Sequence, residues 1–321
     1  MRPALIGDIG GTNARFALVS PGSVEPYAIE NLACADYPGL IEAAKDYLQR
    51  VGAVGQEAPT DACLAFACPV HEERVKLTNN HWEFLKEDVR AALGLSQFKT
   101  LNDFTAQALG ALHVDGEHRH TIKPGTGDPH AAYLVIGPGT GLGVAGVFPG
   151  RHAWIPLPTE GGHVTFAPTD DTERALLAEL HKHHARVSVE RILCGQGLLD
   201  LYHAHCGIEG VPSRCTTPAD VTTAASADDA TAQRTLLRFL KILGDVSGDA
   251  ALTLGARGGV YFCGGILPRL RDWLPQSELA QAFSAKGRLS SYNANTPLWL
   301  MTHPWTGLLG AAEGLRNEEV F

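Results

Sequence analysis

Short apolar segments separated by turn-forming residues occupy the first third of the chain. Segments of strand length and composition lie at residues 3–6, 16–19, 27–32, 61–67 and 98–101. Between them, apolar residues recur at helical spacing from Pro38 to Val51 and from His81 to Gly94, which predicts two amphipathic helices. A third helical pattern follows the last of these strands directly and runs from Asn102 to Leu112. This alternation of strands and helices predicts an α/β domain.

The pattern starts again after a polar stretch at residues 115–130, which we predict to be a loop. A predicted strand at 131–136 leads into a glycine-rich loop at 137–143 and a second strand at 144–148. This order repeats that of residues 3–19, and we interpret it as a weak internal repeat of pattern. Further strands are predicted at 260–263 and 298–301, and further helices at 171–184, after Gly195, at 230–254 and at 308–315. The turn-rich residues 209–229 are predicted to be irregular.

The composition is that of an ordinary globular protein. Of the 321 residues, 45% are hydrophobic and 19% are charged, which argues against disorder, and the length favours roughly two domains. The net charge of -9 argues against nucleic-acid and anionic-membrane partners, because both require clustered Lys and Arg. No apolar run reaches the ~20 residues of a membrane span. We expect neither a signal peptide nor a DNA-binding domain ahead of the first strand.

The cysteines indicate a reducing compartment. Their number is odd, no C-x-x-C pair occurs, and several lie in apolar segments. The seven cysteines are Cys34, Cys63, Cys68, Cys194, Cys206, Cys215 and Cys263. Reduced thiols in a cytoplasmic protein are the simplest interpretation.

The turn between the first two strands carries residue types that can bind an anion. It contains the adjacent glycines Gly10 and Gly11, the hydroxyl of Thr12 and the carboxylate of Asp8. Glycines let backbone N–H groups approach a phosphate closely, and a Thr hydroxyl can donate to a phosphate oxygen. Asp8, at the strand end, could face a metal ion held by that anion. For this turn alone a tight polar hairpin is the favoured alternative, because such turns are common.

Two later glycine turns change that balance. The loop at 137–143 has a central Thr140, and Gly264-Gly265 follows another strand. Neither a Walker loop nor a dinucleotide fingerprint occurs, since no G-x-x-x-x-G-K-[ST] is present and a strand, not a helix, is predicted after Gly143. Together the three turns predict two phosphate-contacting hairpins that face each other across a cleft.

At this point the motifs carry a family resemblance. Asp8-Ile9-Gly10-Gly11-Thr12-Asn13 resembles the first phosphate motif of the sugar kinase, heat-shock 70 and actin superfamily, residues 137–143 its second, and Gly264-Gly265-Ile266 its adenosine motif. Three further pieces, at 101–106, 160–163 and 189–191, narrow the resemblance to bacterial ATP-dependent glucokinases of the proteobacterial type. The six pieces occur in the family's order over essentially the whole chain.

The resemblance implies a two-domain, actin-like (ribonuclease H-like) α/β fold with mixed sheets flanked by helices and a cleft between the domains. Residues 1–110 would form a small domain, with a C-terminal helix at about 305–321 packing back on it, and residues 111–304 a large one. The implied activity is ATP-dependent phosphorylation of D-glucose at the 6-hydroxyl, with ATP and Mg²⁺ required. We also expect a homodimer, because symmetric dimers are common among proteins of this size.

Asp103 is the predicted catalytic base. A kinase needs a group that accepts the proton of the attacking hydroxyl, and a carboxylate at a helix start after a strand is rigidly held. From the residues alone, an N-cap role for Asp103 is at least as well supported. The resemblance favours the base.

The resemblance assigns the remaining site residues by similarity. The sugar contacts would be Asn102, Asp103, Glu160, His163 and Glu190. The nucleotide contacts would be Gly7, Asp8, Ile9, Gly10, Gly11, Thr12, Asn13, Gly137, Gly139, Thr140, Gly141, Gly264 and Gly265. Asp8 would also reach Mg²⁺ indirectly, through ATP. We expect Asn79 and Asn80 to line the same cleft.

Several alternatives remain at this stage. Another hexose (fructose, mannose or N-acetylmannosamine), a polyphosphate donor, an actin-like filament or an ATP-binding sugar sensor without catalysis would use the same fold. A related group carries a cysteine-rich zinc site after its Gly-His pair, whereas residues 164–168 here contain no cysteine, so no structural zinc is expected. The histidines at 181–184 and 203–205 are interpreted as solvated helix ends, because no carboxylate or Cys lies at ligand spacing.

Overall fold

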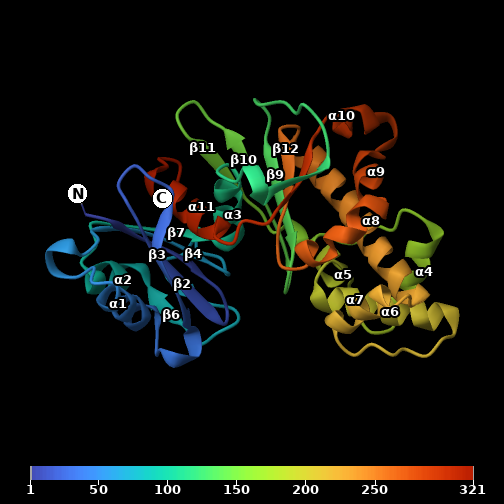
Figure 1. Cartoon of the computed structure of the whole chain (residues 1–321), viewed down its shortest axis with the longest axis horizontal. Helices are drawn as coiled ribbons and strands as arrows, with labels where there is room; N and C mark the ends of the chain where they lie inside the picture. Colours follow the sequence, from blue (N-terminus) through green and yellow to red (C-terminus); the bar gives the residue numbers. More distant parts are fainter. Residues whose placement is uncertain (1, 321) are drawn as a thin grey trace. The chain divides into compact units, whose positions relative to one another are not determined.

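The computed structural model describes residues 2–320, which divide into two compact units (Figure 1). Unit 1 contains the residues up to 116, residues 147–158 and the residues from 303 onward. Unit 2 contains residues 117–146 and 159–302. The chain therefore passes between the units four times, and unit 1 is assembled from segments far apart in the sequence.

Unit 1 contains a five-stranded mixed sheet in the order β3-β2-β1-β4-β7. Its strands are β1 Ala4–Ile9, β2 Asn13–Val19, β3 Pro26–Ala33, β4 Asp61–Phe66 and β7 Gln97–Asn102. β1, β4 and β7 are parallel, and their register aligns Ile9 with Phe66 and Phe66 with Asn102. The carboxyl ends of these three strands therefore meet at one edge of the sheet, where open α/β sheets commonly bind ligands.

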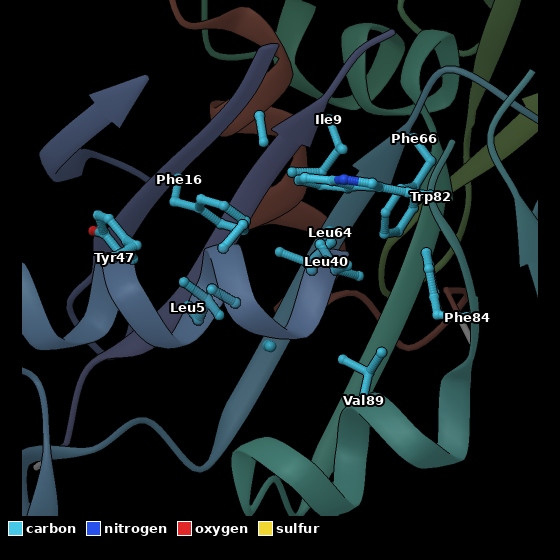
Figure 2. Close-up of a cluster of buried hydrophobic side chains, with 14 of the residues drawn as sticks. Leu5, Ile9, Phe16, Leu40, Tyr47, Leu64, Phe66, Trp82, Phe84 and Val89 are labelled. Carbon is cyan, nitrogen blue, oxygen red and sulfur yellow. The ribbon is translucent and has the colours of Figure 1, made fainter. Parts of the chain in front are cut away.

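Helices α1 (Leu40–Arg50) and α2 (Lys86–Leu93) contribute to the hydrophobic core on one face of this sheet. Figure 2 shows this core, with side chains of β1, β2 and β4 packed against both helices. Tyr47 of α1 stacks on Phe16 with ring centroids 5.5 Å apart. The fully buried Trp82 donates its indole N–H to the Tyr37 carbonyl at 3.2 Å, so its polar group is satisfied inside the core.

Helix α11 (Thr306–Arg316) packs against α3 (Asp103–Ala111) and contacts β1 and β4. The two helices approach backbone to backbone. A Cβ on Gly310 would lie 1.7 Å from the Ala106 carbonyl oxygen, and one on Gly110 would lie 2.0 Å from that of Thr306. Only glycine fits at these two positions, and the helix that begins at Asp103 is thereby held by the last helix of the chain.

The second sheet has six strands in the order β11-β10-β9-β12-β13-β8. They are β8 Arg119–Lys123, β9 Tyr133–Pro138, β10 Leu142–Pro149, β11 Trp154–Pro158, β12 Gly259–Phe262 and β13 Leu298–Met301. β9, β12 and β13 are parallel, and β8 joins the edge antiparallel to β13. The turns at 139–141 and 264–265 thus follow two adjacent parallel strands, β9 and β12.

Seven helices belong to unit 2 among the described residues. They are α4 Asp171–Leu180, α5 Val189–Ile192, α6 Gly195–Glu209, α7 Pro218–Ser226, α8 Ala230–Leu254, α9 Leu279–Ser284 and α10 Ser290–Ala294. The predicted helix at 230–254 is confirmed at both ends, because Asp229 caps its first turn and Gly255 ends it in the left-handed conformation. Within the described residues, no helix is long and apolar enough to cross a membrane.

Two segments predicted to be irregular contain regular structure. Residues 115–130 include β8. Its polar sequence does not indicate a strand, and the strand forms because its backbone pairs with β13. Residues 209–229 include α7, which begins with a capping box between Thr217 and Asp220. The paired three-residue strands β5 (Arg74–Lys76) and β6 (Glu83–Leu85) are also absent from the predicted strands, because they are too short to show a period.

Short 3₁₀ turns complete the chain. They are η1 Cys34–Asp36, η2 Gly55–Glu57, η3 Gly116–His118, η4 Gly161–His163, η5 Leu267–Gln276 and η6 Gly287–Leu289. Of these, η4 carries the predicted sugar-binding Gly-His pair.

Candidate active site

The first glycine turn of unit 1 joins β1 to β2 and is closed by a hydrogen bond from Gly10 N to Asn13 O at 2.9 Å. Gly11 is packed so closely that a Cβ would lie 2.7 Å from that of Asn79, and the Asn80 amide donates to Gly10 O at 3.3 Å. The side chains of Thr12 and Asn13 are exposed. The 79–80 segment therefore supports the loop from behind and leaves its polar side chains accessible.

Two of the predicted nucleotide residues lie deeper than the rest of this loop. Gly7 and Ile9 are buried in β1, where a Cβ on Gly7 would lie 2.8 Å from a methyl carbon of Leu64. The glycine at position 7 is therefore explained by strand packing.

Asp8 lies at the end of β1 with its side chain partly buried. Its Oδ2 is 3.3 Å from Arg15 Nη1, and a Cβ on Gly307, in the first turn of α11, would lie 2.8 Å from the same oxygen. Burial raises the pKa of Asp8, and the Arg15 guanidinium opposes this shift. The Arg15 guanidinium in turn stacks 5.0 Å from the ring centroid of Trp305. A carboxylate in this setting would be stabilised by a further cation, and its oxygens are the donor type that Mg²⁺ prefers.

Asn102 and Asp103 begin α3 at the sheet edge that also carries the first loop. Asn102 is the N-cap, and its Oδ1 accepts from Phe104 N at 3.0 Å and Thr105 N at 3.4 Å. The interpretation of Asp103 as the N-cap is therefore wrong, because it occupies the first helical position, with Oδ1 accepting from Phe104 N at 2.9 Å. β7 lies two strands from β1, a separation of about 10 Å.

The second glycine loop lies in unit 2 between β9 and β10. Gly139 N donates to Gly141 O at 2.8 Å, and Gly139 O accepts from Gly195 N, at the start of α6, at 2.9 Å. Thr140 is exposed, and a Cβ on Gly139 would meet no atom within 4 Å. The backbone around Gly139 is therefore open to a ligand, whereas Gly137 is buried in β9.

The adenosine-type turn packs directly on this loop. Gly264 has a φ of 83°, and a Cβ there would lie 2.4 Å from the Pro138 carbonyl oxygen. Gly265 faces open space. Gly139 and Gly265 therefore leave the backbone of both turns unshielded by side chains, and accessible backbone N–H groups fit the phosphates of the predicted nucleotide.

Three predicted sugar residues of unit 2 are gathered beside the second loop. His163 Nδ1 lies 3.7 Å from Glu190 Oε1, and His163 Nε2 lies 3.9 Å from Glu160 Oε2. The turn η4, which carries His163, packs directly against the backbone of β10, since a Cβ on Gly162 would be 2.2 Å from Leu142 O. Two carboxylates and an imidazole can accept from and donate to sugar hydroxyls.

Other features of the chain lie apart from these residues. Cavities of about 450 and 660 Å³ are lined by the β7–α11 region and by α4, α6 and α8, and none of the predicted site residues lines either. Among the described residues, no group of three or more His, Cys, Asp or Glu side chains could hold a metal ion. Arg15, Trp305 and Gly307, which surround Asp8, are not among the predicted site residues, although Arg15 lies only two residues beyond the first motif.

Comparisons with known proteins agree over the whole length. A family model described as glucokinase matches residues 5–318. Curated glucokinases of Chromohalobacter salexigens and Marinobacter nauticus are 61% and 54% identical over 99% of this chain, and the matches cover 99% and 98% of those proteins. The crystal structure of a glucokinase from an Antarctic psychrotroph has a TM-score of 0.91 at 36% identity, covering 98% of this chain and 99% of that one. The predicted fold class is confirmed.

A more distant likeness concerns the fold alone. A ROK family glucokinase from Streptomyces griseus, solved in complex with glucose and AMPPNP, has a TM-score of 0.64 at 17% identity, covering 98% of this chain and 99% of that one.

Proposed function

Because the chain belongs to the glucokinase family, we propose that it transfers the γ-phosphoryl group of ATP to the 6-hydroxyl of D-glucose. The enzyme is a kinase of that family, and its full-length relatives do not favour the other hexoses or the non-catalytic sensor. The observation that carries the proposal is the gathering of Glu160, His163 and Glu190 beside an open glycine loop.

The proposed base is Asp103. The 6-hydroxyl oxygen of glucose attacks the γ-phosphorus, the bond to the leaving oxygen of ADP breaks, and the hydroxyl proton passes to the Asp103 carboxylate. The products are glucose 6-phosphate and ADP. Support for this role is the position of Asp103 on the first turn of α3, which fixes its backbone, while Asn102 satisfies the helix N-terminus in its place.

Hydrogen bonding to the sugar is proposed for Asn102, Asp103, Glu160, His163 and Glu190. The nucleotide is proposed to lie on residues 10–13, 139–141 and 264–265, where backbone N–H groups and the hydroxyls of Thr12 and Thr140 would offset charge on the transferring group. The buried Gly7, Ile9 and Gly137 would act by shaping these loops. Asp8 would contact Mg²⁺ indirectly, through the ATP that binds the ion, and the ion would neutralise phosphate charge.

Further parts of the proposal concern the whole protein. We propose a small domain of residues 1–110 with the C-terminal helix at about 305–321, and a large domain of residues 111–304. We further propose that the enzyme is cytoplasmic, that it acts at the entry of glycolysis and that it is a homodimer. Seven cysteines without a disulfide, all within the described residues, support a reducing compartment.

A coupled assay of ADP release tests the proposal. The purified protein is supplied with Mg-ATP and, in turn, glucose, fructose, mannose, N-acetylmannosamine or no sugar. We expect release with glucose to exceed release with every other sugar, and release without sugar to be negligible. Preference for another hexose would contradict the substrate, and release independent of sugar would contradict a kinase.

A further inference from the structure

The carboxylate of Glu190 contacts both halves of the site in unit 2. Its Oε2 accepts from Leu142 N, in the second glycine loop, at 3.0 Å. Its Oε1 lies 3.7 Å from Nδ1 of His163. The proposed function uses Glu190 only as a sugar contact, which leaves its hydrogen bond to the nucleotide loop unexplained.

The loop is shaped to admit this carboxylate. A Cβ on Gly141 would lie 2.5 Å from Glu190 Oε2 and 3.3 Å from its carboxyl carbon, so any larger residue at position 141 would displace the carboxylate. Gly139, two residues earlier in the same loop, has open space around its Cβ position. The glycine at 141 is thus required by Glu190, and the glycine at 139 is not.

The backbone that carries Glu190 is itself anchored. Ser188 caps α5 through its side chain, which accepts from Arg191 N at 3.2 Å. Beyond α5, Gly195 N donates to Gly139 O at 2.9 Å, and the buried Cys194 caps α6 through its sulfur. The corner formed by α5 and the start of α6 therefore holds the loop at two points, Gly139 and Leu142. With its backbone fixed, the Glu190 carboxylate can shift only by losing one of its two contacts.

From these contacts we infer that Glu190 is a positioning residue for the nucleotide loop as well as a sugar contact, so that hexose binding and nucleotide binding are coupled through one carboxylate. A sugar hydroxyl bound to Oε1 orders the side chain, and an ordered Oε2 holds the Leu142 N–H and with it the loop at 139–141. Because coupling is reciprocal, a change in the loop that displaces the Glu190 carboxylate must alter the affinity for the sugar. This inference rests on the proposed function.

Isothermal titration of glucose in the absence of nucleotide tests the coupling, with Gly141→Ala and Gly139→Ala as a matched pair. Gly141→Ala pushes the carboxylate aside, and we expect glucose binding to weaken about tenfold, the effect of losing a hydrogen bond to a charged group. Gly139→Ala makes the same chemical change in the same loop, and we expect a glucose Kd within about twofold of the parent protein, because its Cβ meets nothing.

The opposite direction gives a second measurement, which also serves if Gly141→Ala does not fold. Glu190→Ala is titrated with Mg-AMPPNP alone, without sugar. We expect the Kd for the nucleotide to rise about tenfold, since Leu142 N loses its partner. Glu160→Ala removes the neighbouring carboxylate, which lies 3.9 Å from His163 Nε2, and is expected to leave that Kd unchanged.

The outcomes separate the two claims. Equal glucose affinity in Gly141→Ala and the parent protein, or equal weakening in both glycine variants, overturns the coupling through Glu190. An unchanged nucleotide Kd in Glu190→Ala also overturns it. If the parent protein neither binds nor phosphorylates glucose, the proposed function fails instead.

Discussion

Asn102 illustrates how one side chain can have a structural task and a proposed catalytic one. Its Oδ1 accepts from two backbone N–H groups of α3, whereas its Nδ2 makes a long contact of 3.5 Å with Cys68 O. The oxygen therefore stabilises the helix, and the amide hydrogens are the part available to a sugar. The two tasks belong to different atoms, so substitutions can separate them.

Asn102→Asp is expected to keep the stability of the protein and to weaken glucose binding. An aspartate oxygen caps the helix as well as an asparagine oxygen does, but it cannot donate to a hydroxyl. Asn102→Ala loses the cap and should lower the free energy of unfolding by about 1 kcal/mol. Denaturant unfolding and glucose titration measure the two effects. A stability loss in Asn102→Asp equal to that in Asn102→Ala would contradict the separation.

Replacing Asp103 with Ala is expected to cut turnover by about three orders of magnitude, the usual contribution of a general base, while glucose binding stays measurable. Asp103→Asn is the matched control for shape, and it should lose turnover equally because an amide accepts no proton at neutral pH. Steady-state kinetics together with glucose titration checks both. Near-normal turnover in either variant would show that another group takes the proton.

At the scale of elements, the contact between α3 and α11 supports the proposed base from behind. Gly110 and Gly310 let the two backbones touch, and Glu313 of α11 binds His113 Nε2 at 3.0 Å. Burial alone would raise the pKa of Glu313, but hydrogen bonds from His113 and Arg316 outweigh it, and the net pKa is lowered. This carboxylate therefore stabilises the folded state above its unfolded pKa, and that contribution disappears as the pH falls through its lowered folded value.

Gly310→Ala should destabilise the protein by about 3 kcal/mol or more and abolish most activity. The new methyl group collides with backbone, which cannot rotate away, so α11 or the start of α3 must shift. Gly207→Ala is the control. Gly207 lies on the exposed side of α6, and its Cβ would be 3.4 Å from the nearest atom, an ordinary contact. There, alanine should stabilise by about 0.5–1 kcal/mol. Thermal unfolding compares the two, and similar losses in both would refute the packing argument.

The same scale shows what the sequence could predict. The α8 helix was predictable to the residue because a long apolar stripe, an Asp cap and a terminal glycine agree. β8 was not, because its residues are polar and its strand conformation depends on β13, more than 170 positions later. The start of α7 does have a local sequence signal, Thr217-Pro218 followed by Asp220, but it lies among turn-forming residues that favour an irregular segment.

The candidate site was predictable in its parts but not in its contacts. Glycine turns after strands identify anion-binding loops by local chemistry, and the resemblance supplied Glu160, His163 and Glu190. The bond from Glu190 to Leu142 joins residues 48 positions apart, and no local pattern encodes it. The same is true of Gly307 beside Asp8, which depends on how α11 returns to the first sheet.

For the whole molecule, the seven cysteines give a simple test of how the thiols are protected. All are buried in the described structure. Burial raises the pKa of Cys63 to about 12 and that of Cys68 to about 11, the latter also through the Asp103 charge. The raised pKa values keep these two thiols protonated at neutral pH, and burial keeps them inaccessible to reagents.

A disulfide reagent such as dithionitrobenzoate should therefore label almost no thiol in the native protein within minutes, and all seven in guanidinium chloride. Absorbance of the released thionitrobenzoate counts both. Rapid labelling of several thiols in the native state would mean that the cores open far more often than their packing suggests.

The discontinuous make-up of unit 1 sets an order in which the protein can acquire its structure during synthesis. Domains generally fold as they leave the ribosome, amino-terminal parts first. Here the first sheet is made early, yet the helix that packs on α3, β1 and β4 is α11, the last to be translated. All of unit 2 is synthesised between the first sheet and α11, so every segment of unit 2 is available for folding before α11 is made. The nascent chain must therefore carry a sheet that lacks the packing of α11 while unit 2 is translated, and the proposed base gains its supporting helix only after that.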